Sequence, residues 1–212
     1  LAFVGSFLLF ESDLLIAKLL LPHFGGSAQG WTGCMMFFQG ALLLGYLYGH
    51  LAATRLNPRR QAWVHLGVLA LAGLAFPLRP VPGSISYPLA ALLLALTTSI
   101  GAPFVALSAT VPTLQRWLAG SDRPERENPY SLYAASNAGA LAGLLLYPLL
   151  IEPLLALDVQ VKLWQACYAL FGLGHLLCIP KPAPFAAPSQ AAAASIPKRR
   201  MAAWVARRRP LR

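Results

Sequence analysis

The chain has 212 residues, 57% of them hydrophobic and only 11% charged, with a formal net charge of +10. Soluble domains average about 25% charged residues, so this composition excludes an ordinary soluble globular protein, which could not cover so much apolar surface. The cations lie beside the ends of apolar stretches, where they fix topology and meet anionic lipid headgroups. This placement argues against a nucleic-acid partner and makes the lipid bilayer the expected one.

Six apolar stretches alternate with loops along the chain. A bilayer core about 30 Å thick is crossed by about 20 helical residues, and most stretches reach that length, although the third is short. Only helices and closed barrels satisfy the backbone in lipid, and the stretches lack the period-two alternation of barrel strands. The predicted fold is therefore all-α, a polytopic membrane bundle of about six transmembrane helices. The stretches are Leu1–Leu21, Trp31–Ala53, Trp63–Leu78, Tyr87–Leu118, Tyr130–Ile151 and Leu163–Ile179.

Lysine and arginine alternate between the loops and give the topology. Fourteen cations fall in the second loop, the fourth loop and the C-terminal tail, whereas Arg79 and Lys162 alone fall in the others. By the positive-inside rule, both ends of the chain are predicted to be cytoplasmic. Four tryptophans near the predicted span ends are expected at the membrane interface; these are Trp31, Trp63, Trp117 and Trp164.

Two features divide the chain further. The fourth stretch is too long for one straight crossing, and Gly101, Pro103 and Pro112 predict a kink near Gly101–Pro103. Residues 180–212 are rich in proline, alanine and arginine, which predicts a disordered cytoplasmic tail or linker after a transmembrane domain of residues 1–179.

The first stretch carries Glu11, Asp13 and Lys18. At 100° per residue Glu11 and Lys18 share a stripe of the helix, while Asp13 points the other way. A charge in the middle of a membrane costs about 2.5–3.5 kcal/mol on insertion scales, so it usually faces the bundle and has a partner. Glu11 is thus either a functional residue or a structurally hydrogen-bonded one, and both interpretations stay open.

Further polar residues lie inside other stretches. Tyr133 and Asn137 are four residues apart on one face of the fifth stretch, and a Glu11–Asn137 hydrogen bond is expected from their similar predicted depth. With Gln39 of the second stretch and the serines and threonines of the fourth, they either line a polar cavity or form interhelical hydrogen bonds. The predicted intramembrane polar site comprises Glu11, Lys18, Gln39, Tyr133 and Asn137.

Two GxxxG pairs are candidate packing faces, Gly45 with Gly49 and Gly139 with Gly143. Such pairs let helix backbones approach closely. No histidine or cysteine spacing matches a metal site, and no phosphate-binding or nucleophile motif occurs, so neither metal nor cofactor is predicted. Whether the chain is an enzyme stays undecided at this point.

Three segments resemble the membrane part of bacterial spermidine-synthase-like proteins, the fused MFS/spermidine synthase family. The matching segments are ESDLLIAKLLLPHFGGSAQGWTG, GALLLGYLYGHLAATRL and NPYSLYAASNAGALAGLLLYPLLIEPLL. The resemblance implies an MFS-like helical half followed, in fuller members, by a cytoplasmic aminopropyltransferase-like domain. That domain would bind a nucleotide like decarboxylated S-adenosylmethionine and a polyamine, and none of its positions exists in this chain. The resemblance marks Glu11, Gly25, Gly26, Asn137 and Gly139 as structural or functional positions.

The leading hypothesis is a non-catalytic membrane module of such a fusion, in the bacterial inner membrane, that anchors or serves the synthase-like domain. A second hypothesis is a half-size secondary transporter that works as a homodimer on a small solute, with cations among the candidates. A third is a membrane enzyme with its own site around Glu11.

Overall fold

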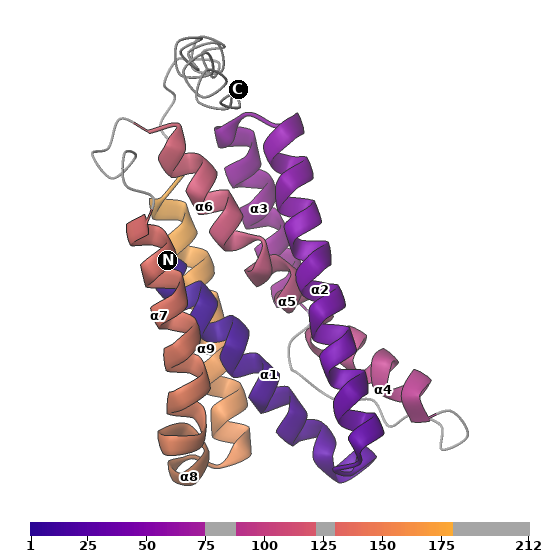
Figure 1. Ribbon diagram of the computed structural model, residues 1–212. Helices are drawn as coiled ribbons and strands as arrows, with labels where there is room; N and C mark the ends of the chain where they lie inside the picture. Colours follow the sequence, from indigo (N-terminus) through magenta and orange to yellow (C-terminus); the bar gives the residue numbers. More distant parts are fainter. Residues whose placement is uncertain (75–87, 122–129, 180–212) are drawn as a thin grey trace, which may run out of the picture. The chain divides into compact units, whose positions relative to one another are not determined.

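The computed structural model describes residues 1–74, 88–121 and 130–179, and every regular element in these ranges is helical (Figure 1). The predicted tail of residues 180–212 lies outside them. The elements are α1 (Ala2–Phe24), α2 (Ala28–Arg55), α3 (Pro58–Gly73), α4 (Pro88–Leu96), η1 (Thr97–Gly101), α5 (Ala102–Ser108), α6 (Thr110–Ala119), α7 (Tyr130–Leu146), η3 (Tyr147–Ile151), α8 (Glu152–Leu154) and α9 (Leu157–Leu177).

Within the described ranges, three helical segments are long and apolar enough to cross a membrane: Ala28–Arg55, Pro88–Ala119 and Tyr130–Leu154. The all-α prediction is confirmed for the described residues, and the three apolar segments fit the predicted location in a membrane. Helix α1 has 23 residues but carries three charged side chains, and α3 has only 16 residues.

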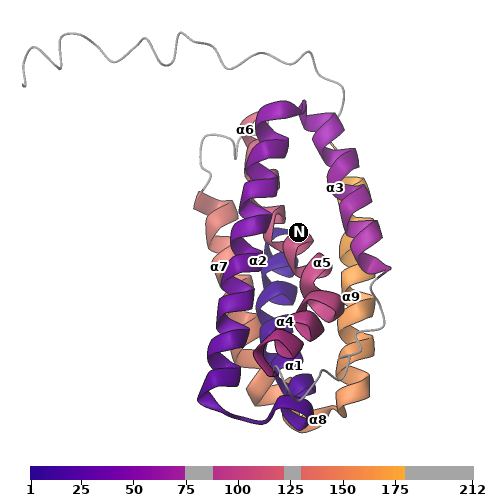
Figure 2. The same cartoon turned by 90° about the vertical axis from the view of Figure 1, so that its right-hand side faces the viewer.

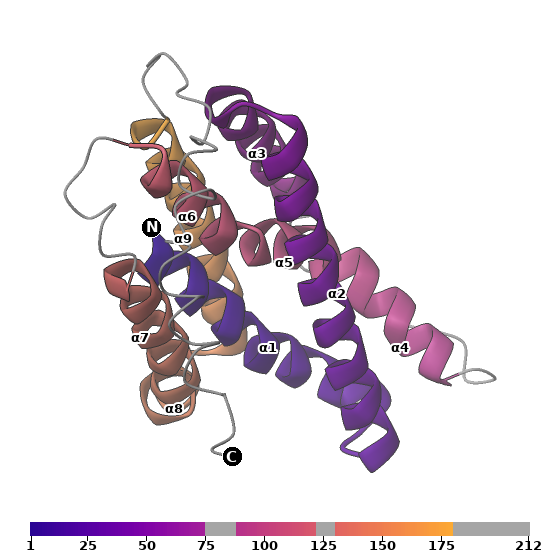
Figure 3. The same cartoon turned by 45° about the horizontal axis from the view of Figure 1, so that its top comes forward.

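Helix α1 lies at the centre of the packing and contacts α2, α4, α5, α6, α7 and α9. It runs parallel to α7, since Phe3 lies against Gly139 and Phe7 against Gly143. It runs antiparallel to α9, where Leu1 lies against Gly174 and Gly5 against Phe171. Figure 3 shows α1 passing between α7 on one side and α2 on the other.

The remaining helices follow the same alternation of direction. Helix α2 runs parallel to the α4–α6 segment, because Gly33 lies against Leu92 and Gly49 against Pro112. Helix α3 runs antiparallel to α9, and the two lie on the same side of the molecule in Figure 2. Successive segments of the described chain therefore point in opposite directions, as consecutive membrane crossings would.

Prolines explain where the helical segments change geometry. Proline has no amide hydrogen and its ring clashes with the carbonyl four residues earlier, so a helix has to widen or bend one turn before it. The π-helical turn η1 immediately precedes α5 with its Pro103, and η3 immediately precedes α8 with its Pro153. A second break at Ala109 comes three residues before Pro112. The predicted kink near Gly101–Pro103 thus coincides with η1, and the Ala109 break adds another.

The outward faces of α2 and α7 are apolar. Large hydrophobic side chains that would be unfavourable in water are exposed along both helices, as lipid-facing positions are. On α2 they include Met35, Met36, Leu43, Leu44, Leu47 and Leu51, and on α7 Leu141, Leu144 and Leu145. This surface is suited to hydrocarbon rather than to water.

Glycine allows the closest helix contacts. A β-carbon at Gly139 would overlap the Phe3 backbone carbonyl, and one at Gly143 would lie 2.7 Å from the carbonyl oxygen of Phe7. On the other side of the bundle, a β-carbon at Gly45 would overlap the Ser108 hydroxyl and lie 2.7 Å from the Val105 carbonyl oxygen. A β-carbon at Gly49 would lie 3.6 Å from the Ala109 carbonyl oxygen, so all four glycines of the two GxxxG pairs lie against the backbone of a neighbouring segment.

Gly139→Ala is expected to lower the free energy of unfolding by about 1–3 kcal/mol, because the added methyl group forces α1 and α7 apart. The measurement is the unfolding transition of the purified chain in detergent, followed by circular dichroism. Gly172→Ala in α9 is the matched control, since nothing lies within 4 Å of a β-carbon there. Equal stability of the two variants would contradict the α1–α7 contact.

Candidate functional site

Glu11 is enclosed in the middle of α1, with only 4% of the residue exposed. Its backbone nitrogen would lie 3.2 Å from a β-carbon at Gly143, so this turn of α1 packs directly on α7. Its carboxyl group lies within electrostatic range of Tyr147 in η3 and of Cys167 in α9. Glu11 therefore occupies the junction of three helices.

Lys18 pairs with Glu152, not with Glu11. The Lys18 Nζ lies 2.9 Å from Glu152 Oε1, and the two side chains are 33% and 44% exposed. The pair joins the last part of α1 to the first residue of α8. Sequence reasoning missed Glu152, although it follows the end of the fifth stretch and would lie at the depth of Lys18 if the two helices ran parallel.

Asp13 is the acidic group of α1 whose bonding is incomplete. Its Oδ1 atom is buried and has no hydrogen-bond partner in the part of the chain that the structure describes. Asp13 follows Glu11 by two residues, so the two carboxyl groups leave the helix about 160° apart. The two carboxyl groups therefore lie on nearly opposite sides of α1.

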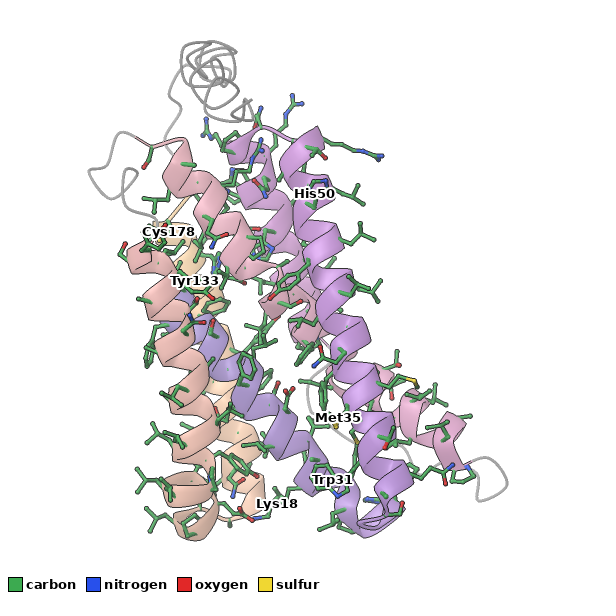
Figure 4. The ribbon with its side chains drawn as sticks, in the orientation of Figure 1. Lys18, Trp31, Met35, His50, Tyr133 and Cys178 are labelled. Carbon is green, nitrogen blue, oxygen red and sulfur yellow. The ribbon has the colours of Figure 1, made fainter. Side chains whose placement is uncertain are left out.

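The other predicted site residues do not gather around Glu11. The parallel register places Asn137 beside Leu1, ten residues along α1 from Glu11, or about 15 Å at the rise of an α-helix. The expected Glu11–Asn137 hydrogen bond is therefore wrong, because the fifth stretch enters the bundle at a different level from the one assumed. Asn137 and Gln39 are exposed, and so is Tyr133. Figure 4 shows Lys18 near the lower end of the bundle and Tyr133 far above it.

Several serines and threonines of the fourth stretch bond to their own helix. Thr97 Oγ1 donates to the Leu93 carbonyl at 2.7 Å, and Thr113 Oγ1 donates to the Ala109 carbonyl at 2.8 Å. Such i−4 bonding satisfies a hydroxyl without a neighbour. Thr98 and Thr110 bond in the same way, and Ser108 donates to the Val105 carbonyl three residues earlier. These hydroxyl groups thus show neither the expected polar cavity nor a set of interhelical bonds; Thr110, which also bonds His65, is the exception.

Helix α9 provides interhelical hydrogen bonds that the sequence did not suggest. Trp164 Nε1 donates to the Leu8 carbonyl of α1 at 3.0 Å, and Tyr168 Oη donates to the Leu69 carbonyl of α3 at 3.1 Å. Tyr147 Oη donates to Gln160 Oε1 at 3.1 Å. Trp164 is 1% exposed and Trp117 is 8% exposed, so both side chains pack inside the bundle, whereas Trp31 and Trp63 are exposed.

Two histidines that looked unrelated in sequence meet inside the bundle. The imidazole rings of His65 in α3 and His175 in α9 have centroids 5.3 Å apart. Tyr48 of α2 and Thr110 of α6 bond the two ring nitrogens of His65 at 3.5 and 3.3 Å. This His65–His175 cluster joins four helices, and no linear spacing could have revealed it.

The candidate metal ligands, the cysteines and Gly25 complete the description of the predicted positions. Among the described residues, no three His, Cys, Asp or Glu side chains could hold a metal ion. The cysteines Cys34, Cys167 and Cys178 are free. Gly25 ends α1 with a φ of 68°, a left-handed conformation that favours glycine, which gives this position a structural reason.

A double-mutant cycle of Lys18→Met and Glu152→Gln is expected to give a coupling energy of about 0.2–1 kcal/mol, because both side chains are partly solvated. The measurement is the free energy of unfolding of the four proteins in detergent. Asp158 and Lys162 form a control pair at 3.5 Å that is more exposed and should couple less. Coupling of several kcal/mol would place the Lys18–Glu152 pair in hydrocarbon instead.

Comparison with known proteins adds no assignment. The chain matches no protein-family model, no curated protein and no solved structure. A function for this chain therefore has to be argued from its own residues and from the three sequence segments quoted above.

Proposed function

We propose that residues 1–179 form a six-span, MFS-like helical half with both ends of the chain on the cytoplasmic side of the bacterial inner membrane. In this proposal the chain is the non-catalytic membrane module of a spermidine-synthase-like fusion protein. It anchors or serves an aminopropyltransferase-like cytoplasmic domain. The resemblance of the three segments supports the family, and the packing supports the membrane module.

The position of α1 carries the proposal. This helix holds three charged residues, yet it is surrounded by six other helical elements, with Glu11 buried and Lys18 paired to Glu152. The outward faces of α2 and α7 are apolar. Charges turned inward and apolar groups turned outward are the arrangement that a lipid environment selects.

The alternation of helix direction supports six crossings. Helices α1, α3 and α7 run one way, and α2, α4–α6 and α9 run the other. The loops rich in arginine follow α2 and α6, which both end on the same side in this arrangement. Arginine on one side of the membrane agrees with cytoplasmic ends.

The mass of the native protein tests the fusion. An antibody against the peptide of residues 116–129 is expected to detect, in source membranes, a protein much larger than the 22.8 kDa of this chain. The larger band should also be recovered when membranes are washed at high pH, which removes peripheral proteins. A single membrane-bound band near 23 kDa would contradict the fusion and favour a unit that acts alone.

A half-size transporter that acts as a homodimer is the second candidate. The observation that favours it is the buried Oδ1 of Asp13, which has no partner among the described residues although it lies in the middle of a central helix. An acidic group left unpaired inside a membrane is a natural binding group for a cationic solute. Glu11 adds a second carboxyl group close by in sequence.

If the transporter function holds, Asp13→Asn and Glu11→Gln each reduce uptake of radiolabelled spermidine into membrane vesicles by at least about tenfold, since each removes a carboxylate that could hold a cation. Asp158→Asn at the exposed start of α9 is the control and should keep full flux. Quantitative blotting of vesicle membranes checks insertion. Unchanged flux in Glu11→Gln and Asp13→Asn vesicles would rule out the transport role of both acids.

A further inference from the structure

A groove lies where the end of α1 meets the start of α2 and α4, at the end of the bundle opposite the arginine-rich loops. Its first hollow has an empty volume of about 300 Å³, and none of the nine described residues that line it is charged. The larger of these side chains are Leu20, Leu21, Phe24, Trp31, Cys34 and Leu92. The functions proposed above leave this groove unassigned.

Glycine keeps the groove open at the turn between α1 and α2. Gly25 and Gly30 both line the first hollow, and neither carries a side chain that could fill it. No described atom lies within 4 Å of a β-carbon at Gly25, and the φ of 68° there disfavours any larger residue. The hollow therefore follows from the glycines of this turn.

A second hollow of about 280 Å³ adjoins the first and shares Phe24, Gly30 and Leu92 with it. It is also lined by two exposed polar side chains, Ser27 and Gln29. Ser27 Oγ accepts a hydrogen bond from the Gly30 backbone nitrogen at 3.1 Å, which fixes the position of this hydroxyl group. The groove thus changes from apolar to polar along its length, as an amphiphilic molecule does.

The first hollow opens onto the outward face of α2. Two of its lining side chains, Leu21 and Trp31, are 49% and 51% exposed. Met35 follows Trp31 by one helical turn, is 64% exposed and belongs to the apolar outward face of α2. Figure 4 shows Trp31 and Met35 along the same lower part of α2. Hydrocarbon that covers this face of α2 therefore reaches the hollow directly.

The two ends of the groove match the two levels of a membrane leaflet. Trp31 marks the predicted start of the second span, where the bilayer changes from headgroups to hydrocarbon. Ser27 and Gln29 precede it, at the level of the headgroups, whereas Cys34 follows it, at the level of the acyl chains. An amphiphile that entered from the bilayer would thus have its polar part beside the polar end of the groove.

We propose that the groove binds one acyl chain of a bilayer phospholipid, with the ester region of that lipid beside Ser27 and Gln29. An empty hollow would leave its lining atoms without van der Waals partners, and hydrocarbon supplies them. Ligand pockets measure about 300–1,000 Å³, so the first hollow fits part of one chain and not a whole lipid. The proposal rests on the membrane location proposed above, but on neither the fusion nor the transport function.

Photo-cross-linking of the full chain in lipid nanodiscs tests the site. The nanodiscs contain phosphatidylethanolamine and phosphatidylglycerol, with a trace of phosphatidylethanolamine whose acyl chain carries a diazirine. After irradiation, mass spectrometry of peptides compares adducts on Leu21, Trp31 and Cys34 with adducts on Leu141 and Leu145 of the outward face of α7. We expect at least about fivefold more adducts in the groove, because a bound chain stays there while the surrounding lipids exchange.

The α7 face separates failure of the groove from failure of the membrane location. Equal labelling of the two surfaces would overturn the proposal and make the groove an ordinary part of the lipid-facing surface. Labelling of α7 alone would also overturn it, since a second copy of the chain or another protein would then cover the groove. Absence of adducts from both surfaces would overturn the membrane location together with the groove.

Substitutions in the hollow identify the binding site. Ala17 lines the first hollow, and Ala17→Phe is expected to lower groove adducts at least about fivefold, because the added ring occupies the space of the acyl chain. Ala138→Phe adds the same ring on the exposed surface of α7 and should leave groove adducts unchanged. Circular dichroism checks that the variants are folded. Undiminished groove labelling of folded Ala17→Phe would overturn the proposal.

Leu21→Ser decides the question where Ala17→Phe fails to fold. This position is half-exposed, so the helix packing tolerates the change, while the hollow loses part of its apolar lining. We expect at least about twofold fewer adducts on Trp31 and Cys34, since fewer contacts hold the chain. Leu144→Ser on α7, where the leucine is 41% exposed, is the matched control and should keep full groove labelling. Equal groove labelling of the two serine variants would overturn the proposal.

Discussion

The contact between α1 and α7 is the constraint on which the other packing depends. The backbone carbonyls of Phe3 and Phe7 face Gly139 and Gly143, with no room for side chains between them. In lipid there is little hydrophobic drive to bring helices together, so close backbone approach and van der Waals contact have to supply it. This contact sets the parallel register of the two helices, and the register decides which polar groups of α1 meet which partners. The Lys18–Glu152 pair follows from it directly.

A second group of interactions holds α9 in place. Trp164 and Tyr168 lie on one stripe of that helix. Each donates a hydrogen bond to a backbone carbonyl of a different neighbouring helix. A backbone carbonyl in an α-helix has a second lone pair, so it accepts such a bond without losing its helical one. Large aromatic side chains thus pack as apolar bodies and still satisfy their one hydrogen-bonding atom. Together with the glycine contacts, they place α9 against both α1 and α3.

Sequence could predict the helical membrane class, the packing glycines as candidates and a kink near Pro103, because each depends on local composition. It could not predict which side chains meet, because that depends on the register between helices. The sequence predicts similar depths for Asn137 and Glu11, whereas the observed register between α7 and α1 places them at different depths. His65 and His175 are 110 residues apart, and nothing in their spacing links them. Glu152 was overlooked for the same reason, since its partner lies on a different helix.

The polar groups inside the bundle fall into two kinds, and the difference indicates where function is to be sought. Those of the first kind, such as Trp164 and Thr113, donate a hydrogen bond to a backbone carbonyl, which gives them a structural role. Those of the second kind keep a buried atom without a partner among the described residues, and they include Arg116, Trp117 and Gln165 as well as Asp13, Gln61 and His175. Burying an unpaired polar atom costs free energy. We therefore expect each of these atoms to gain a hydrogen-bond partner in another state of the protein, from solvent or from a ligand. The two places to examine are therefore the middle of α1 and the junction of α3 with α9.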